Sequence, residues 1–249
     1  MRRLEIPRVV KMPVEVQATE ALRESIITGA IPAGARITEA QISEQIHISR
    51  ATIRTALHQL EKEGLLTLVP YTGWTVISLT SEDIWELYTL RSAVERLAAQ
   101  LVAKSIDAAK RASLNAAFNK LASECAKGVT SRIADADFAL HKAVIDCAAH
   151  KRLLIQYSLI EQQIRMYIRS SDALIPDPAM IIDQHRPIVD AIMAGDIKAS
   201  GRLSEQHNLR EGEKLTAYVR DLERKADKRA FAAPPPSGKR KAGGKALDR

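Results

Sequence analysis

One carboxylate and three imidazoles in the second half of the chain have the residue types and spacing of a metal site. Asp137 and His141 are four residues apart, so they project from the same face of one helix. His185 lies ten residues before Gly195 and His207 twelve residues after it, which places both at nearly the same height on an antiparallel helix pair. Neutral imidazole and carboxylate suit Zn, Ni, Mn or Fe(II), and Zn is favoured. Taken singly, each histidine also fits a surface or hydrogen-bonded residue, and this alternative stays open.

A second candidate site is formed by Arg50 and Arg54, four residues apart in the stretch ISRATIRTAL. Arginine gives bidentate hydrogen bonds to guanine, and Ser or Thr hydroxyls bond to phosphates or base edges. The stretch is therefore a candidate DNA-reading helix, with Ser49 and Thr52 near its start. The solvated face of an ordinary amphipathic helix gives the same pattern, so these ten residues alone do not separate the two interpretations.

Length and composition exclude several classes of protein. A chain of 249 residues has room for two domains. No segment approaches the roughly 18 uninterrupted apolar residues of a membrane helix, and the amino terminus lacks the features of a secretory signal. The two cysteines, Cys125 and Cys147, have no close partner spacing, which indicates a reducing compartment. We therefore expect a soluble cytoplasmic protein that does not use the membrane.

The net charge of +7 is concentrated at the carboxyl end. Residues 225–249 contain eight Lys or Arg against two Asp, so the rest of the chain is close to neutral. This segment is rich in Pro, Gly, Ala and Lys, which predicts a basic disordered tail. The overall charge is therefore no evidence for specific DNA recognition, although the tail could add attraction to phosphate.

The elements before residue 80 predict a module that presents Arg50 and Arg54. Helical periodicity indicates three short helices, over about residues 16–28, 39–46 and 50–63. Thr38 and Gln41 form a capping box, Ser49 caps the third helix, and Gly64 ends it. Alternation around the turn PYTG then predicts a two-stranded hairpin. This order is that of a winged helix-turn-helix, whose second motif helix enters the major groove of DNA.

The remainder of the chain is predicted to be almost entirely helical. Thr80 with Asp83 three residues later starts a long amphipathic helix. Others are expected over about 107–127, 132–149, 151–170, 178–194 and 196–224, giving a bundle of about six helices. The predicted fold is thus mainly α: a winged helix-turn-helix with a two-stranded wing over 1–80, an all-α bundle over 81–224, and a tail over 225–249.

The amino-terminal module resembles the DNA-binding domain of the GntR family of bacterial transcription regulators. Spaced matches run through LRESIITGAIPAGARITEAQISEQIHISRATIRTALHQLEKEGLLTLVPYTGWTV. The resemblance implies that the Ser-Arg helix reads the operator and that the glycine at the hairpin tip approaches the minor groove. It departs from the family at His47, where a turn glycine is usual, and at Thr52 and Thr55. The implied DNA-binding residues are Ser49, Arg50, Thr52, Arg54 and Gly73, whereas Trp74 is expected in the wing core.

The helical domain is similar to the FCD domain of the FadR-like branch of that family. The metal-binding members carry an Asp and a His four apart, then two His about 22 residues apart, and this chain fills all four positions. The resemblance implies a metal held by Asp137, His141, His185 and His207, and it argues against an acyl-CoA effector. It also implies a small organic-acid effector that binds the metal and Arg91.

The role of Arg91 has an alternative, a surface pair with Glu95 four residues later. Arg165 and Arg169 are further candidates for binding the effector. His150 is expected to cap a helix.

These features together predict a dimeric transcription regulator that binds double-stranded operator DNA, with repression relieved by the effector. A homodimer follows from the pseudo-palindromic half-sites that paired recognition helices read. One alternative is a metal-dependent hydrolase or oxygenase fused to a nucleic-acid module. Such an enzyme needs a base or acid beside the metal, and Glu95 is the only candidate by spacing. A helical dimerisation domain with an empty pocket is the third possibility.

Overall fold

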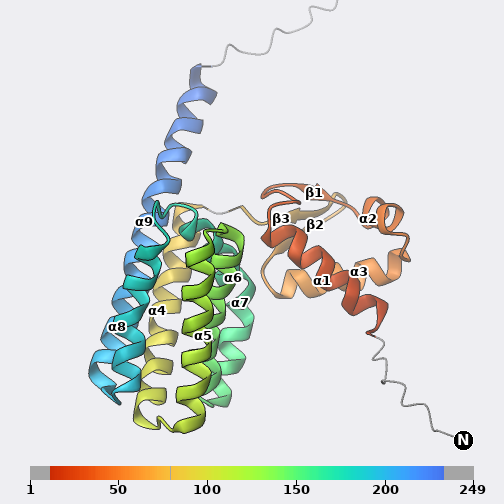
Figure 1. Ribbon diagram of the computed structural model, residues 1–249. Coiled ribbons are helices and arrows are strands. Elements are labelled where there is room, and N and C mark those ends of the chain that lie inside the picture. The colour runs from red at the N-terminus through yellow and green to blue at the C-terminus, as the bar shows by residue number, and fades with distance from the viewer. Residues whose placement is uncertain (1–11, 79, 233–249) are drawn as a thin grey trace, which may run out of the picture.

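A computed structural model describes residues 12–78 and 80–232, in which a small winged helix unit lies beside a taller bundle of helices (Figure 1). The winged helix unit contains α1 (Val14–Ile27), α2 (Glu39–Ile46) and α3 (Arg50–Lys62). The bundle contains α4 (Ser81–Lys104), α5 (Ala108–Lys127), α6 (Thr130–Cys147), α7 (Lys151–Asp172), α8 (Ala179–Met193) and α9 (Ile197–Ala232). The predicted fold class is confirmed.

The wing has one more strand than the sequence predicts. β2 (Leu66–Val69) and β3 (Gly73–Val76) form the expected hairpin, and β1 (Arg36–Ile37) pairs with the free edge of β3. All pairs are antiparallel, with Ile37 opposite Trp74. A two-residue strand is too short to show an alternating pattern, so only the packing of the loop against β3 identifies it.

Local capping fixes the helix-turn-helix as expected. Thr38 and Gln41 form the predicted capping box on α2, and the Ser49 hydroxyl accepts the backbone N–H of Thr52 at the start of α3. His47 adopts the left-handed conformation in the turn, with φ 55°, at the position where the family usually has Gly. Trp74 is buried in the core of this unit, as predicted. The start of α3 is therefore held by its own backbone and caps.

The bundle buries apolar side chains from all six of its helices, α4 to α9. None of the helices in the described ranges is long and apolar enough to cross a membrane. α9 does not end at residue 224 but continues to Ala232 (Figure 1). The added residues are mostly Lys, Arg and Ala, which favour helix, and Lys225 pairs with Asp221 one turn earlier. The rest of the predicted basic tail, residues 233–249, lies outside the described residues.

Gly212 on α9 permits a close approach to α4. A Cβ atom at this position would lie 2.6 Å from the Cβ of Tyr88, which is fixed to the α4 backbone. We predict that Gly212→Ala lowers the free energy of unfolding by about 1–3 kcal/mol because of this overlap. Urea unfolding followed by circular dichroism measures the change.

Gly201 on the same helix is the matched control. A Cβ there would also lie 2.6 Å from its neighbour, but that neighbour is the flexible side chain of Gln100, which can rotate away. Gly201→Ala is therefore expected to stay within about 1 kcal/mol of wild type, helped by the better helix propensity of alanine. Equal losses of stability in the two variants would contradict the packing argument.

Candidate metal centre and nucleic-acid interface

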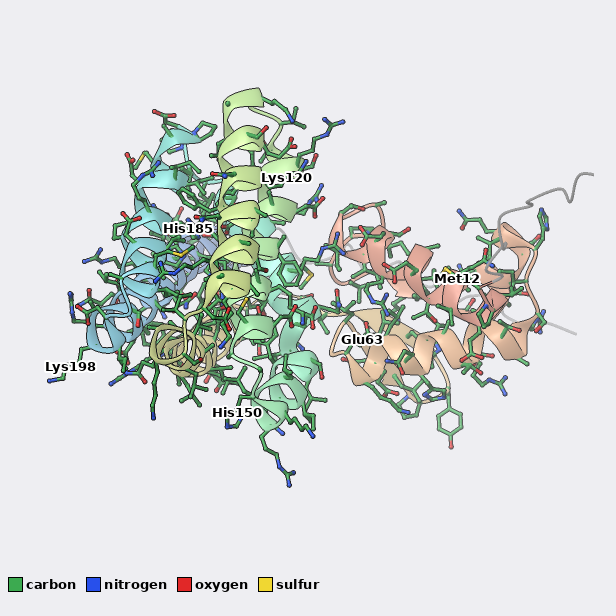
Figure 2. The ribbon with its side chains drawn as sticks, turned by 60° about the horizontal axis from the view of Figure 1, so that its bottom comes forward. Met12, Glu63, Lys120, His150, His185 and Lys198 are labelled. Atoms are coloured by element: carbon green, nitrogen blue, oxygen red, sulfur yellow. The ribbon has the colours of Figure 1, made fainter. Side chains whose placement is uncertain are left out.

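The four predicted metal ligands converge inside the helical bundle. His141 on α6, His185 on α8 and His207 on α9 are buried and each offers a ring nitrogen, and these atoms all lie within 4.8 Å of one another. Oδ1 of Asp137 on α6 lies 2.8 Å from Nε2 of His185 and 3.9 Å from Nε2 of His141. Figure 2 shows His185 within the bundle, away from the winged helix unit. The antiparallel arrangement of α8 and α9 brings together residues that are far apart in sequence.

The hydrogen bonds behind the cluster turn the Nε2 atoms of His185 and His141 toward its centre. Nδ1 of His185 lies 2.7 Å from the carbonyl oxygen of Ile181, and a carbonyl can only accept, so Nδ1 carries the proton. Nδ1 of His141 lies 2.7 Å from the carboxylate of Glu95, which gives the same tautomer. The two Nε2 atoms then face each other at 3.1 Å, with the Asp137 carboxylate beside them. A cation that displaces the proton between His185 and Asp137 would meet two ring nitrogens and a carboxylate, a set that suits a divalent transition metal.

The electrostatics of the cluster favour positive charge at its centre. Burial by itself lowers the pKa of His185, but the charge and hydrogen bond of Asp137 raise it to about 9. Burial opposes the ionisation of Asp137, yet the neighbouring imidazoles lower its pKa to about 2. Burial and the other two histidines push the pKa of His207 well below its ordinary value, so His207 is held neutral. Asp137 and His207 are therefore already in the forms that bind a metal, whereas His185 is protonated near neutral pH and would release that proton on binding.

Glu95 supports the cluster in a way that sequence spacing did not reveal. Its Oε2 contacts Nδ1 of His141 at 2.7 Å and accepts a hydrogen bond from the side-chain amide of Asn208 at 3.0 Å. Its Oε1 accepts from Nε of Arg91 at 2.7 Å. A carboxylate behind a ligating histidine fixes the ring and raises its basicity. Because 46 residues separate Glu95 from His141, no local pattern indicates this contact.

Arg91 is buried, so of the two alternatives for this arginine a surface pair with Glu95 does not hold. The pair exists, but both side chains are only 3% exposed. Nη2 of Arg91 has no hydrogen-bond partner among the described residues. Arg91, Asp137, His185 and His207 line one cavity of about 10 Å³, which has room for about one water molecule. The structure therefore places an unpaired guanidinium nitrogen on the cavity that Asp137, His185 and His207 border.

The other candidate arginines, Arg165 and Arg169, and the predicted helix cap His150 do not line this cavity. Arg165 pairs with Glu24 of α1 and with Asp135, and Arg169 lies 4.0 Å from the same aspartate. Neither arginine lines the metal-side cavity. The ring of His150 accepts the backbone N–H of Leu153 at the start of α7, which confirms the predicted cap.

The predicted DNA-reading residues lie at the amino end of α3. Ser49, Arg50 and Arg54 are exposed, and Thr52 is half-buried beneath the capping hydroxyl. Within the described part of the chain Arg50 makes no ion pair. Arg54 forms a bidentate pair with Glu39 at the start of α2, with both N–O distances 2.8 Å. The sequence did not indicate this pair, so of the two arginines Arg50 is the one free to meet DNA without losing a partner.

Gly73 directly follows the turn at residues 70–72 and so lies beside the tip of the wing, where the resemblance placed it. It begins β3 with φ 108°, and a Cβ there would lie 2.8 Å from the carbonyl oxygen of Ile37. The glycine is therefore required by the close pairing of β1 with β3. The turn itself exposes Tyr71, a non-glycine residue with φ 64° whose side chain is fully exposed. No local sequence pattern indicates this exposure, because it depends on the shape of the turn.

Two family models match this chain in consecutive segments. The model described as "Bacterial regulatory proteins, gntR family" matches residues 15–76, and the model described as "FCD domain" matches residues 86–210. These matches fall on the winged helix unit and on the bundle that contains the histidine cluster, respectively.

Individual relatives that match over most of their length give the same assignment. A protein of Paenarthrobacter nicotinovorans named "Probable D-xylose utilization operon transcriptional repressor" is 31% identical over 76% of this chain and 83% of its own length. The gluconate operon transcriptional repressor of Bacillus licheniformis is 25% identical over 70% of this chain and 74% of its own. A GntR regulator from Rhodococcus sp. RHA1 shares the fold, with a TM-score of 0.70 at 23% identity over 82% of this chain and 98% of that one.

Proposed function

The chain belongs to the GntR family of bacterial regulatory proteins, with an FCD domain as its helical unit, and on this premise we propose that it is a transcription repressor released from DNA by a small carboxylate. Membership in this family makes it a transcription regulator and sets aside the fused-enzyme alternative. The names of the two relatives given above, both repressors, support repression as the sign of control.

The observation that carries the effector proposal is the polar cavity in the bundle. Asp137, His141, His185 and His207 would hold a divalent metal, with Zn favoured and Ni, Mn or Fe(II) also suited to the ligands. When bound, the metal would supply a Lewis-acidic anchor for a carboxylate oxygen. Arg91 contributes a buried, unpaired N–H on the same cavity, which suits the second oxygen of that carboxylate. The three histidines with this arginine favour a sensor over an empty dimerisation domain.

α7 offers a physical connection between the cavity and the DNA-binding unit. Near its carboxyl end, Ser171 and Asp172 line the cavity. Two turns earlier, the amide of Gln163 donates to the backbone carbonyl of Gly64 at 3.0 Å, and Arg165 pairs with Glu24. Figure 2 shows Glu63, the neighbour of Gly64, on the side of the winged helix unit that faces the bundle. An effector larger than one water must move the cavity walls, and a shift of α7 would reorient the winged helix.

The proposed contacts with operator DNA and the proposed homodimer are both argued from the recognition helix, α3. Ser49, Arg50, Thr52 and Arg54 are proposed to contact bases and phosphates in the major groove, with the wing beside them. A homodimer would present two such helices to half-sites about one helical turn apart on double-stranded DNA. Reorientation of each winged helix would change that spacing and release the operator.

Arg91→Lys tests the effector proposal. Lysine keeps a positive charge beside Glu95 but lacks the second planar N–H, so we expect the effector concentration needed for release to rise about tenfold or more. DNA affinity without effector is expected to stay unchanged. Fluorescence anisotropy of a DNA fragment from upstream of the chain's own gene, titrated with a panel of small carboxylates, measures both quantities.

Arg96→Lys is the matched control for this experiment. Arg96 lies on the same helix but forms an exposed pair with Glu205, away from the cavity. Its replacement is expected to leave release by carboxylates unchanged. If Arg91→Lys responds to every active carboxylate as wild type does, Arg91 does not bind the effector.

A further inference from the structure

The wing carries no charged side chain. Residues 64–78, which include β2, the turn and β3, contain no Asp, Glu, Lys, Arg or His. The residues at its tip, 69–72, are all exposed, and so is Leu68 beside them. Lysine and arginine are the side chains that neutralise DNA phosphates. Any contact that this wing makes with DNA must therefore be uncharged.

Tyr71 occupies a position in the turn that normally requires glycine. The backbone N–H of Thr72 donates to the carbonyl oxygen of Val69 at 3.1 Å, and Tyr71, which follows Pro70, has φ 64°. These features are typical of a type II turn, whose third residue has positive φ and is usually Gly or Asn. A tyrosine held in this conformation costs free energy.

The Tyr71 ring offsets none of this cost inside the chain. It is fully exposed and makes no hydrogen bond with the described residues. By contrast, Trp74 on β3 is buried, and its ring meets the ring of His58 on α3 with the centroids 4.8 Å apart. One aromatic side chain of the wing thus fixes it to α3, and another faces solvent. Backbone strain together with full exposure indicates a contact outside the chain.

The wing is attached to the helix that is proposed to read DNA. Its buried side chains share one core with those of α3, namely Leu66, Trp74, Val76, Ile53, Leu57 and Leu60. With α3 in a major groove, the attached hairpin lies over the flanking backbone and the adjoining minor groove. Gly73 is packed against the carbonyl oxygen of Ile37, whereas Tyr71 projects freely. Tyr71 is therefore the better placed of the two to enter that groove.

The minor groove offers a tyrosine an uncharged binding site. It is about 6 Å wide, so an aromatic ring can enter it edge-on. A·T pairs present only acceptors there, N3 of adenine and O2 of thymine, whereas G·C pairs add the N2 amino group of guanine. The phenol hydroxyl can donate to the acceptors, while the amino group obstructs the ring and is itself a donor.

We propose that Tyr71 determines sequence preference through the wing: its ring enters the minor groove beside each half-site and selects A·T base pairs there. The ring contributes apolar contact with the sugars, and the hydroxyl donates to the base acceptors. Because this contact is uncharged, it releases no counterions and does not depend on salt, unlike the contacts of Arg50 with phosphates. The inference rests on the proposed function, since it needs α3 on the operator.

The first test uses an operator that the full-length wild-type protein selects from random-sequence duplexes. Tyr71→Ala is expected to bind it about tenfold more weakly, because the apolar contact is lost. The slope of log affinity against log salt should stay unchanged. Tyr71→Lys adds a cation and should steepen that slope by about 0.9 for each winged helix bound. Tyr218→Ala removes an exposed tyrosine from α9 and is the control, which should bind as wild type does.

The second test changes the base pairs that flank the half-sites. Each flanking A·T pair is replaced by G·C or by I·C, in which inosine lacks the N2 amino group. I·C therefore keeps the minor-groove pattern of A·T but has the major-groove pattern of G·C. Wild type should bind A·T and I·C flanks alike and G·C flanks severalfold more weakly. This preference should fall severalfold in Tyr71→Phe, which keeps the ring without its hydroxyl, and disappear in Tyr71→Ala.

Tyr71→Gly separates a role in binding from a role in the fold. Glycine adopts the positive φ of this turn without strain, so the variant should be at least as stable as wild type in urea unfolding. It should nevertheless bind the operator about tenfold more weakly, as Tyr71→Ala does. A residue that only supported the turn would not give an unchanged stability together with a loss of affinity.

The outcomes distinguish this inference from the function on which it rests. If Tyr71→Ala binds as tightly as wild type, the role of Tyr71 is overturned. If I·C flanks bind as G·C flanks do, the minor groove is not what is read. If Tyr71→Ala changes the oligomeric state of the free protein in light scattering but not its DNA affinity, the ring contacts another protein chain. In all three cases DNA binding by α3 stands. If the selection enriches no sequence, both the inference and the proposed function fail.

Discussion

The Arg50→Ala protein is expected to bind its operator about tenfold to a hundredfold more weakly than wild type, because a bidentate contact to a base is typically worth about 1–3 kcal/mol. Arg50 is exposed at the start of α3 and makes no ion pair within the described residues, so it can approach DNA without losing a contact. Anisotropy with operator and scrambled DNA at one fixed salt concentration measures affinity and sequence preference together.

Arg54→Ala is expected to have a smaller effect on affinity than Arg50→Ala. In the free protein Arg54 is bound to Glu39, so a contact with DNA would have to replace or share that pair. Lys62→Ala, at the opposite end of the same helix, is the control and should bind as wild type does. If the double variant Arg50→Ala plus Arg54→Ala retains full affinity and sequence preference, α3 is not the reading helix.

The second large effect that we expect is loss of metal binding when a proposed metal ligand is replaced. Wild type should bind about one zinc ion per chain. Replacing a residue that only supports a metal ligand typically lowers metal affinity by roughly 10–100-fold. Because Asp137→Ala and His185→Ala each remove a proposed ligand, their zinc affinity should fall by more than this. Zinc at about a hundred times its Kd should stabilise wild type by about 2.7 kcal/mol, and neither variant should gain this. Elemental analysis and thermal unfolding with and without a chelator provide the measurements.

Two further variants show whether the loss is specific to the cluster. Glu95→Gln should weaken zinc binding by about 10–100-fold, because Glu95 orients the ring of His141 without occupying a ligand position. His150→Ala removes a histidine that caps α7 and should retain the metal despite a loss of about 1 kcal/mol of stability. Metal content in Asp137→Ala and His185→Ala equal to that of wild type would contradict the proposed site.

Most of the fold could be predicted because its signals are local. The capping boxes at Thr38 and Thr80, the cap at Ser49 and the stop after α3 depend on residues three or four positions apart. β1 was not predicted because the strand depends on pairing with β3, which is distant in sequence. The extension of α9 to Ala232 was not predicted because the composition of residues 225–232 is similar to that of the tail that follows.

The sequence by itself determined the helices and the hairpin, the placing of Asp137 and His141 on one helical face, and the start of α3 at Ser49. These properties depend on helical periodicity and on caps, which act between neighbours in the chain. Only the tertiary structure decided that the pair of Arg91 and Glu95 is buried, that Glu95 supports His141, and that Arg91 borders a cavity together with Asp137 and His185. Burial and contacts between α4, α6, α7, α8 and α9 arise from packing, and packing joins residues that no local spacing connects.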